Sequence, residues 1–243
     1  MIASAIAGVD GCRSGWLAVS RLSQQAEPAA AVFAEFADLV AALPNDTVIA
    51  VDMPIGLPDR IAQGGRGPER LVRPLLGQRQ SSVFSIPARA AVYASDYGEA
   101  CRLALETSDP PRKVSKQAFF LFEKIRQIDK LLIDDVSLRR RIIEVHPELA
   151  FWRLNDGVAM QLPKKVKGRV SEPGMAERIA LLACCGYSTG FLRQKLPGGA
   201  GRDDLIDAAA VMLIAERHIK GQTAAFPDPP PQDAFGIEVA IRA

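Results

Sequence analysis

The stretch Ile6–Gly11 (IAGVDG) decides how the rest of the chain is interpreted, because an aspartate ends a run of small and β-branched apolar residues. The same pattern returns in Val48–Pro54 (VIAVDMP). A short β-branched apolar run is typical of a buried strand, and burying an unpaired carboxylate at its end is costly. Asp10 and Asp52 therefore predict two neighbouring strands that carry a cation site or an acid–base pair at one edge of a sheet.

Apolar segments around these two aspartates predict an α/β fold. Strands are expected at residues 5–10, 16–22, 31–36, 48–52 and 142–146, the first two forming a hairpin around the glycine-bounded loop 11–15. Helices are expected at residues 36–43, 114–141 and 175–185, and from Asp203 onward. No internal repeat or linker divides the sequence, so we expect residues 1–243 to form a single domain.

Residues 60–89 differ from the surrounding sequence, because they carry six arginines and one acid, Glu69, between glycines and prolines. We interpret this stretch as a basic, partly helical insertion that leaves the end of the Asp52 strand. Ligands of α/β sheets tend to bind at the carboxyl ends of the strands. The insertion is therefore expected to border the acidic site.

The bulk composition sets limits on the class of protein. A chain of 243 residues with 48% apolar and 24% charged residues is ordinary for a globular protein. No apolar run approaches the about 20 residues of a membrane span, and the N-terminus lacks the basic region of a signal peptide. The four cysteines have no zinc-binding spacing. We therefore expect a reduced, cytoplasmic location and no membrane partner. The composition favours no particular oligomeric state.

Two further segments add oxygen ligands and one imidazole. Glu144 and His146 alternate along a predicted strand, and Asp204 and Asp207 share one face of a predicted helix because they are three residues apart. Hard divalent cations prefer oxygen ligands, and a pair of them can assist phosphodiester hydrolysis. Simpler roles stay open: a helix cap for Asp203, a solvated helix face for Asp207, a turn contact for Asp10 and a structural hydrogen bond for His146.

Basic residues in the loops are candidates for holding an anionic substrate, because arginine and lysine bind phosphate. The candidates are Arg13, Arg79, Arg89, Lys116, Lys164 and Lys165, with His146 as a further contact. Solvated surface charge explains most of them equally well. Aromatic residues make up only 6% of the chain and are not interleaved with these charges, which argues against a stacking platform for single strands.

Six segments occur in a fixed order along the chain. They are residues 8–16 (GVDGCRSGW), 52–58 (DMPIGLP), 81–84 (SSVF), 115–118 (SKQA), 144–148 (EVHPE) and 203–208 (DDLIDA). On these segments the chain resembles a family of uncharacterised proteins regarded as predicted nucleases with an RNase H-like fold. The resemblance implies a mixed five-stranded sheet flanked by helices, in which the acid of the first strand lies beside the acid of the fourth.

Residues 204–208 are also similar to the D-x-x-D-A motif in the terminal helix of Holliday-junction resolvases. This similarity implies metal-binding roles for Asp10, Asp52, Asp204 and Asp207, with Mg²⁺ or Mn²⁺ as the ion. The chain departs from the resolvases in carrying Asp52 where they have a glutamate. It departs from the predicted nucleases in carrying Glu69 where they more often have an aspartate.

The predicted function is therefore a metal-dependent phosphodiester hydrolase that acts on nucleic acid or another phosphoester. The catalytic residues expected from the motifs are Asp10, Asp52, Glu144, Asp204 and Asp207. One alternative is an acid-rimmed binding module without turnover, and a divalent-ion titration would separate this alternative from the other hypotheses. Another is a nucleotide-phosphate-binding protein of the related actin-like ATPase architecture, which also begins Gly-x-Asp-Gly but needs a duplicated core that this sequence lacks.

Overall fold

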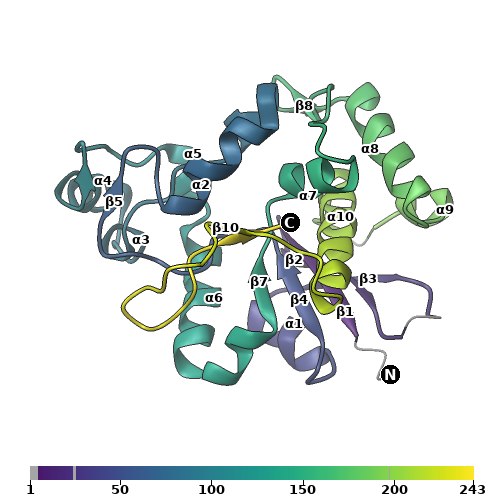
Figure 1. The fold of residues 1–243 in the computed structure, drawn as a ribbon, viewed down its shortest axis with the longest axis horizontal. Helices are drawn as coiled ribbons and strands as arrows, with labels where there is room; N and C mark the ends of the chain where they lie inside the picture. Colours follow the sequence, from purple (N-terminus) through teal and green to yellow (C-terminus); the bar gives the residue numbers. More distant parts are fainter. Residues whose placement is uncertain (1–4, 24–25, 197) are drawn as a thin grey trace.

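A seven-stranded mixed sheet forms the centre of the computed structural model, which describes residues 5–23, 26–196 and 198–243 (Figure 1). The strand order is β10–β11–β7–β4–β1–β2–β3. The strands are β1 (Ile6–Cys12), β2 (Gly15–Arg21), β3 (Ala29–Phe33), β4 (Val48–Val51), β7 (Ile142–Glu144), β10 (Ala225–Phe226) and β11 (Ile241–Arg242). The first three strands form an antiparallel meander, whereas β1, β4, β7 and β11 run parallel. The predicted hairpin of β1 and β2 is confirmed.

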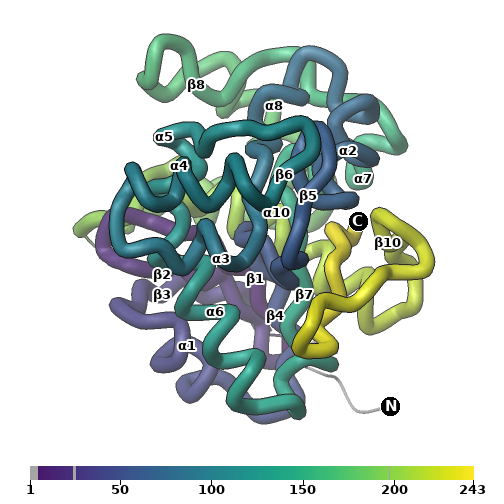
Figure 2. The backbone as a smooth tube through the Cα atoms, turned by 90° about the vertical axis from the view of Figure 1, so that its left-hand side faces the viewer, coloured from purple at the N-terminus to yellow at the C-terminus, as the bar shows by residue number. Residues whose placement is uncertain are grey.

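The prediction of a five-stranded sheet is wrong, because the C-terminal tail adds two strands at the β7 edge. Strand β11 pairs with β7 through Ile241 and Glu144, and β10 pairs with β11. Figure 2 shows this yellow segment lying beside β7. Each added strand has two residues, which is too short to show an apolar periodicity in the sequence.

Two hydrophobic cores cover opposite faces of the sheet, since side chains alternate along each strand. In β1, Ala7 and Val9 pack in the core that contains α1 (Phe36–Ala42) and α6 (Phe122–Asp134). Ile6 packs in the other core, whose helices are α7 (Pro147–Leu154), α8 (Glu172–Cys184) and α10 (Arg202–Ile219). No helix in the described residues is long and apolar enough to cross a membrane.

Helix α10 crosses β1 at Gly8, where there is no room for a side chain. A Cβ atom on Gly8 would lie 2.1 Å from the carbonyl oxygen of Ala208 and 2.2 Å from the amide nitrogen of Met212. The helix therefore packs directly on the strand backbone. Because Asp207 precedes Ala208, this contact holds Asp207 beside the strand that carries Asp10.

The chain between β4 and α6 forms a layer of short elements on the side of the molecule that faces the viewer in Figure 2. The elements are β5 (Ile61–Ala62), α2 (Gly67–Val72), the 3₁₀ segment η1 (Arg73–Ser82), α3 (Arg89–Val92), α4 (Tyr97–Glu106), β6 (Ser108–Asp109) and α5 (Lys116–Phe119). The helix expected over residues 114–141 is divided into α5, α6 and the 3₁₀ segment η2 (Val136–Arg140). The basic loop near residue 164 is a small hairpin of β8 (Lys165–Val166) and β9 (Arg169–Val170), and α9 (Thr189–Leu192) precedes α10.

Candidate metal centre and the adjoining pocket

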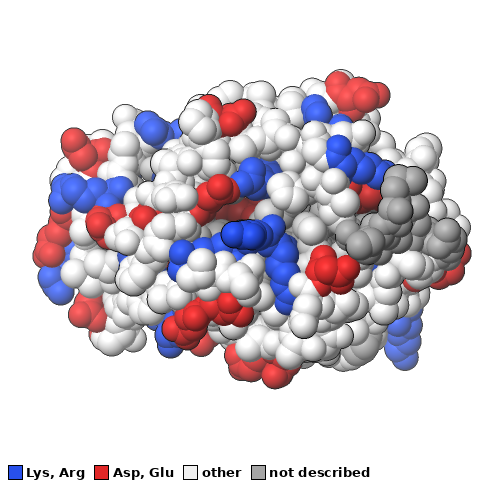
Figure 3. Space-filling view, turned by 60° about the horizontal axis from the view of Figure 1, so that its bottom comes forward, with Lys and Arg blue, Asp and Glu red and all other residues white. Residues whose placement is uncertain are grey.

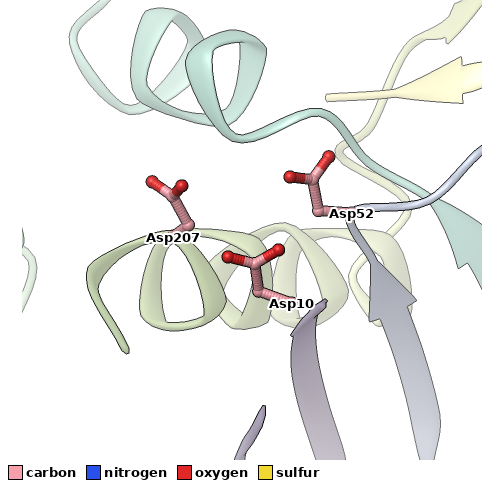
Figure 4. Close-up of side chains that lie close together, drawn as sticks. All are labelled: Asp10, Asp52 and Asp207. Atoms are coloured by element: carbon pink, nitrogen blue, oxygen red, sulfur yellow. The ribbon is translucent and has the colours of Figure 1, made fainter. Parts of the chain in front are cut away.

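Three carboxylates meet at the carboxyl ends of β1 and β4, as Figure 4 shows. Asp10 belongs to β1, Asp52 follows β4, and Asp207 lies on α10. One oxygen from each carboxylate lies within 4.8 Å of the others. The parallel register sets Val9 opposite Val51, so the next residue of each strand reaches the same edge of the sheet. We call Asp10, Asp52 and Asp207 the acid triad.

Burial and mutual repulsion make the acid triad electrostatically unfavourable without a cation. Burial, and then the charges of Asp52 and Asp207, raise the pKa of Asp10 well above 3.8. Burial also raises the pKa of Asp52, with Asp207 adding to the effect and Lys164 opposing it. Oδ1 of Asp207 is buried and has no hydrogen-bond partner in the described residues. Such carboxylates are stabilised by a proton or by a positive partner.

Lys164 is the basic side chain that contacts the triad, and its Nζ pairs with Oδ2 of Asp207. Burial would lower the pKa of Lys164, but the charges of Asp207, Asp10 and Asp52 outweigh that effect and raise the pKa above its ordinary range. When all three carboxylates are ionised, three negative charges and one ammonium leave a net charge of two negative units. The triad therefore fits one hard divalent cation, which prefers carboxylate oxygens.

The other two acids at the start of α10 make different contacts. Oδ2 of Asp204 accepts a hydrogen bond of 2.8 Å from the amide of Gly201, which satisfies a backbone donor before the first helical turn. Asp203 pairs with Lys165 at 2.5 Å. Asp204 is thus not a member of the acid triad, although its charge acts on Asp10 and it shares a helix with Asp207.

Glu144, which was expected to support the site, is held by an arginine instead. Nη2 of Arg66 donates to Oε1 of Glu144 at 2.7 Å, and Nη1 donates to Oε2 at 3.1 Å. The amide of Ile55 donates to the same Oε2 at 2.7 Å. Nε of Arg66 donates to Oε1 of Glu69 at 2.8 Å. We call Arg66, Glu69 and Glu144 the arginine cluster, and its hydrogen bonds occupy both oxygens of Glu144.

A pocket of about 160 Å³ lies between the acid triad and the arginine cluster. Asp10 and Asp52 contribute to its wall, and so do Glu69 and Glu144. Its apolar wall comes from Met53, Val83, Phe84, Ile86 and Leu121. Residues 82–86 belong to the predicted insertion, so this segment borders the acidic site as expected.

His146 lines the same pocket as a neutral side chain. Its Nε2 lies 3.3 Å from the carbonyl oxygen of Ser82, and because a carbonyl only accepts, we assign the proton to Nε2. Nδ1 is then an acceptor, and it is buried without a partner in the described residues. Burial lowers the pKa of His146 to about 4, so the ring is uncharged at neutral pH.

Most of the predicted phosphate-binding residues make contacts elsewhere. Arg89 pairs with Asp129 and Asp233, and Arg79 lies 3.4 Å from the side-chain oxygen of Gln78. The exposed residues Arg13 and Lys116 do not belong to the pocket wall. On the face drawn in Figure 3, basic side chains gather around a central hollow but are interspersed with acidic ones. Of the predicted basic contacts, the structure brings Lys164 to the triad.

Three charged pocket residues were not predicted from the sequence. Lys124 of α6 donates to the carbonyl oxygen of Gly15 at 2.7 Å and lies over the Trp16 ring. Arg66 and Glu69 complete the opposite side. The three-residue spacing of Arg66 and Glu69 is a signal for a helical ion pair, whereas no local pattern identifies Lys124.

The sequence of this chain matches one known protein family. Residues 8–232 match the family described as protein of unknown function (DUF429). The chain belongs to the DUF429 family. No curated protein and no solved structure matches the chain. The DUF429 match includes the whole acid triad, whereas β11 lies beyond it.

Proposed function

We propose that this DUF429 protein is a metal-dependent phosphodiester hydrolase with an RNase H-like fold that acts on nucleic acid. The observation that supports the proposal is the acid triad, in which two adjacent parallel strands and the C-terminal helix each supply one carboxylate. The same three elements supply the metal-binding acids in the resolvases that the sequence resembles. The six ordered sequence segments that resemble the predicted nucleases also support an RNase H-like fold.

Asp10, Asp52 and Asp207 would hold one Mg²⁺ or Mn²⁺ ion. A bound ion of this kind supplies Lewis-acid polarisation of a phosphoryl oxygen and lowers the pKa of a bound water. Lys164 balances one of the three negative charges through its pair with Asp207. Because its ammonium lies at the edge of the triad, it is also placed to contact a phosphate oxygen.

A second hollow supports a polymeric substrate rather than a small phosphoester. It has a volume of about 580 Å³ and shares Val83 and Phe84 with the pocket beside the triad. Arg112 and Lys113 line it, and the SSVF and SKQA motifs meet there through Ser81, Phe84, Ser115 and Gln117. The two hollows therefore adjoin at Val83 and Phe84, and we expect an anionic strand bound at the triad to extend toward the second one.

The proposal is tested by incubating the full chain with labelled single-stranded DNA, duplex DNA, branched DNA and RNA in the presence of Mn²⁺ or Mg²⁺. We expect cleavage of at least one substrate, loss of cleavage in excess EDTA, and loss in Asp207→Asn. Asp46→Asn is the matched control, because Asp46 is exposed and precedes β4 at the opposite end of the sheet. Cleavage that persists in EDTA would contradict the proposal.

Calorimetry with Mn²⁺, combined with the cleavage assay, separates the hydrolase from a binding module. Both predict binding that Asp207→Asn weakens, but only the hydrolase predicts turnover. For the hydrolase, single changes in the triad should each remove most of the activity, and combined changes should add little, because the carboxylates act as one unit. Metal binding without cleavage of any substrate would favour the binding module.

A further inference from the structure

The pocket beside the acid triad has the size of one small ring system. Its volume is about 160 Å³, well above the about 10–15 Å³ that a cavity needs to admit one water molecule, so a small planar ring can enter it. A nucleobase has about this size. A base pair or a duplex would not enter, so a nucleic acid must present one unpaired base to reach the pocket.

The apolar part of the wall suits a flat ring. Phe84 is 38% exposed and lines the pocket together with Leu121 and Met53. Aromatic side chains bind nucleobases by stacking, and every base offers a face for this contact. A single aromatic residue next to a small pocket differs from the extended platform that the low aromatic content argues against.

The polar part of the wall offers acceptors that lack donors. Glu69 is 2% exposed, and Arg66 donates to its Oε1, but its Oε2 is buried without a partner in the described residues. Nδ1 of His146 is a second buried acceptor of this kind. The arginine cluster also holds two carboxylates against one guanidinium. A group with N–H donors would satisfy these atoms, because buried polar groups need hydrogen-bond partners.

We propose that this pocket binds one nucleobase that has an amino group where uracil, thymine and guanine have the O4 or O6 carbonyl, which means cytosine or adenine. Cytosine N4 and adenine N6 are donors, whereas thymine presents the O4 acceptor at the corresponding place. The proposal deepens the proposed function and rests on it for the substrate class. Asp10 and Asp52 line the same pocket, so the phosphate attached to the bound nucleotide would lie at the acid triad.

The test compares cytidine with uridine, which differ in having an amino group or a carbonyl at the same ring position. NMR titration of the full chain in EDTA measures both dissociation constants without a phosphate or a metal ion. We expect cytidine to bind at least about tenfold more tightly than uridine. Glu69→Gln keeps an oxygen for Arg66 and replaces the free acceptor with an amide donor. The ratio of the uridine to the cytidine dissociation constant should therefore fall to one or below.

The matched control is Glu148→Gln, since Glu148 is a buried carboxylate that pairs with Arg178 at 2.6 Å outside the pocket wall. It should leave the ratio of the two affinities unchanged. Phe84→Ala should weaken both nucleosides while keeping the ratio, and this test remains informative if Glu69→Gln does not fold. Equal affinities of the wild type for both nucleosides, or no binding of either, would overturn the proposal.

The two proposals can fail separately. A cytidine preference in a protein that cleaves no substrate would reject the hydrolase and keep the base pocket. Metal-dependent cleavage with equal cytidine and uridine affinities would reject the base pocket and keep the hydrolase.

Discussion

The acid triad and the arginine cluster are two groups of buried acids on neighbouring strands, and they differ in how their charge is balanced. Val51 of β4 pairs with Glu144 of β7, so Asp52 and Glu144 are nearly adjacent across the sheet. Arg66 makes two hydrogen bonds to Glu144 and one to Glu69. The triad has one lysine, which pairs with a single member, Asp207.

This difference separates Glu144, whose two oxygens are occupied by hydrogen bonds, from the carboxylates of a candidate metal site. Arg66 is always charged and holds Glu144 in a fixed fork, so little remains for a ligand at that carboxylate. The acid triad keeps two negative charges close together, and a divalent cation would neutralise them. Both the acid triad and the arginine cluster are buried, so burial alone does not indicate a ligand. The evidence for a ligand at the triad is that its negative charges have too few positive partners.

The largest expected effect comes from removing the arginine. Arg66→Met would leave Glu69 and Glu144 buried without a counter-charge, and breaking a buried ion pair in this way costs about 3–5 kcal/mol. We expect the free energy of unfolding, measured by urea denaturation, to fall by this amount. Arg70→Met is the control, because Arg70 is an exposed residue of α2, the helix that Arg66 precedes, and it should change stability by less than about 0.5 kcal/mol. Similar losses in both variants would remove the distinction between the two acid groups.

Removing one acid of the triad should have the opposite effect on stability. Asp52→Asn relieves both the burial of a charge and its repulsion with Asp207, so the metal-free protein should be as stable as the wild type or more stable. Its affinity for Mn²⁺ should fall at least about tenfold, because replacing even a residue that only hydrogen-bonds to a metal ligand lowers metal affinity about tenfold or more. Calorimetry and urea denaturation on the same samples provide both values. A variant that is destabilised and still binds Mn²⁺ normally would show that Asp52 is structural.

Part of this comparison was predictable from local sequence. The apolar runs that end in Asp10 and Asp52 predicted neighbouring strands, and the parallel pairing of β1 and β4 confirms this placement. The helical spacing of Asp204 and Asp207 predicted a shared face but could not distinguish them. The structure separates them because an acid in the first turn can reach back to a free backbone amide, and Asp204 does so at Gly201.

The arginine cluster was not predictable, because its partners are far apart in the sequence. Arg66 and Glu144 are separated by 78 positions, and no local periodicity links them. Glu144 therefore had the sequence pattern of a site residue, an acid at the end of an apolar strand. The two-residue strands β10 and β11 escaped prediction for a related reason, since their pairing depends on β7 rather than on their own sequence.

The pH dependence of stability provides a smaller test. Burial raises the pKa of Asp10 and Asp52 above 3.8 and that of Glu144 to about 7. Each group binds its proton more tightly in the folded chain than in the unfolded chain. The stability that each contributes is therefore present at low pH and lost as the pH rises through the folded-state pKa.

We expect the Tm of the EDTA-treated protein, measured by calorimetry, to fall between about pH 5 and about pH 8 as these groups ionise. Asp52→Asn should show a shallower fall because one of the groups is absent. Mn²⁺ should restore the Tm of the wild type at the upper end of the range. A Tm that rises steadily over this range would show that the carboxylates are already compensated within the protein.

The smallest expected effect belongs to Asp204, the acid that the sequence could not separate from Asp207. Asparagine at position 204 keeps an oxygen for the Gly201 amide and loses only the negative charge near the start of α10. That charge is worth about 0.3–1 kcal/mol at a helix N-terminus, but burial and the charges of Asp203 and Asp207 oppose it and raise the pKa of Asp204 to about 6. Asp204→Asn should therefore change the free energy of unfolding by less than about 1 kcal/mol in either direction. Its Mn²⁺ affinity should match that of the wild type, in contrast to Asp207→Asn, and calorimetry on the two variants makes the comparison. If both variants lose Mn²⁺ to the same extent, Asp204 moves into the metal site on binding, and the cation is held by four carboxylates rather than three.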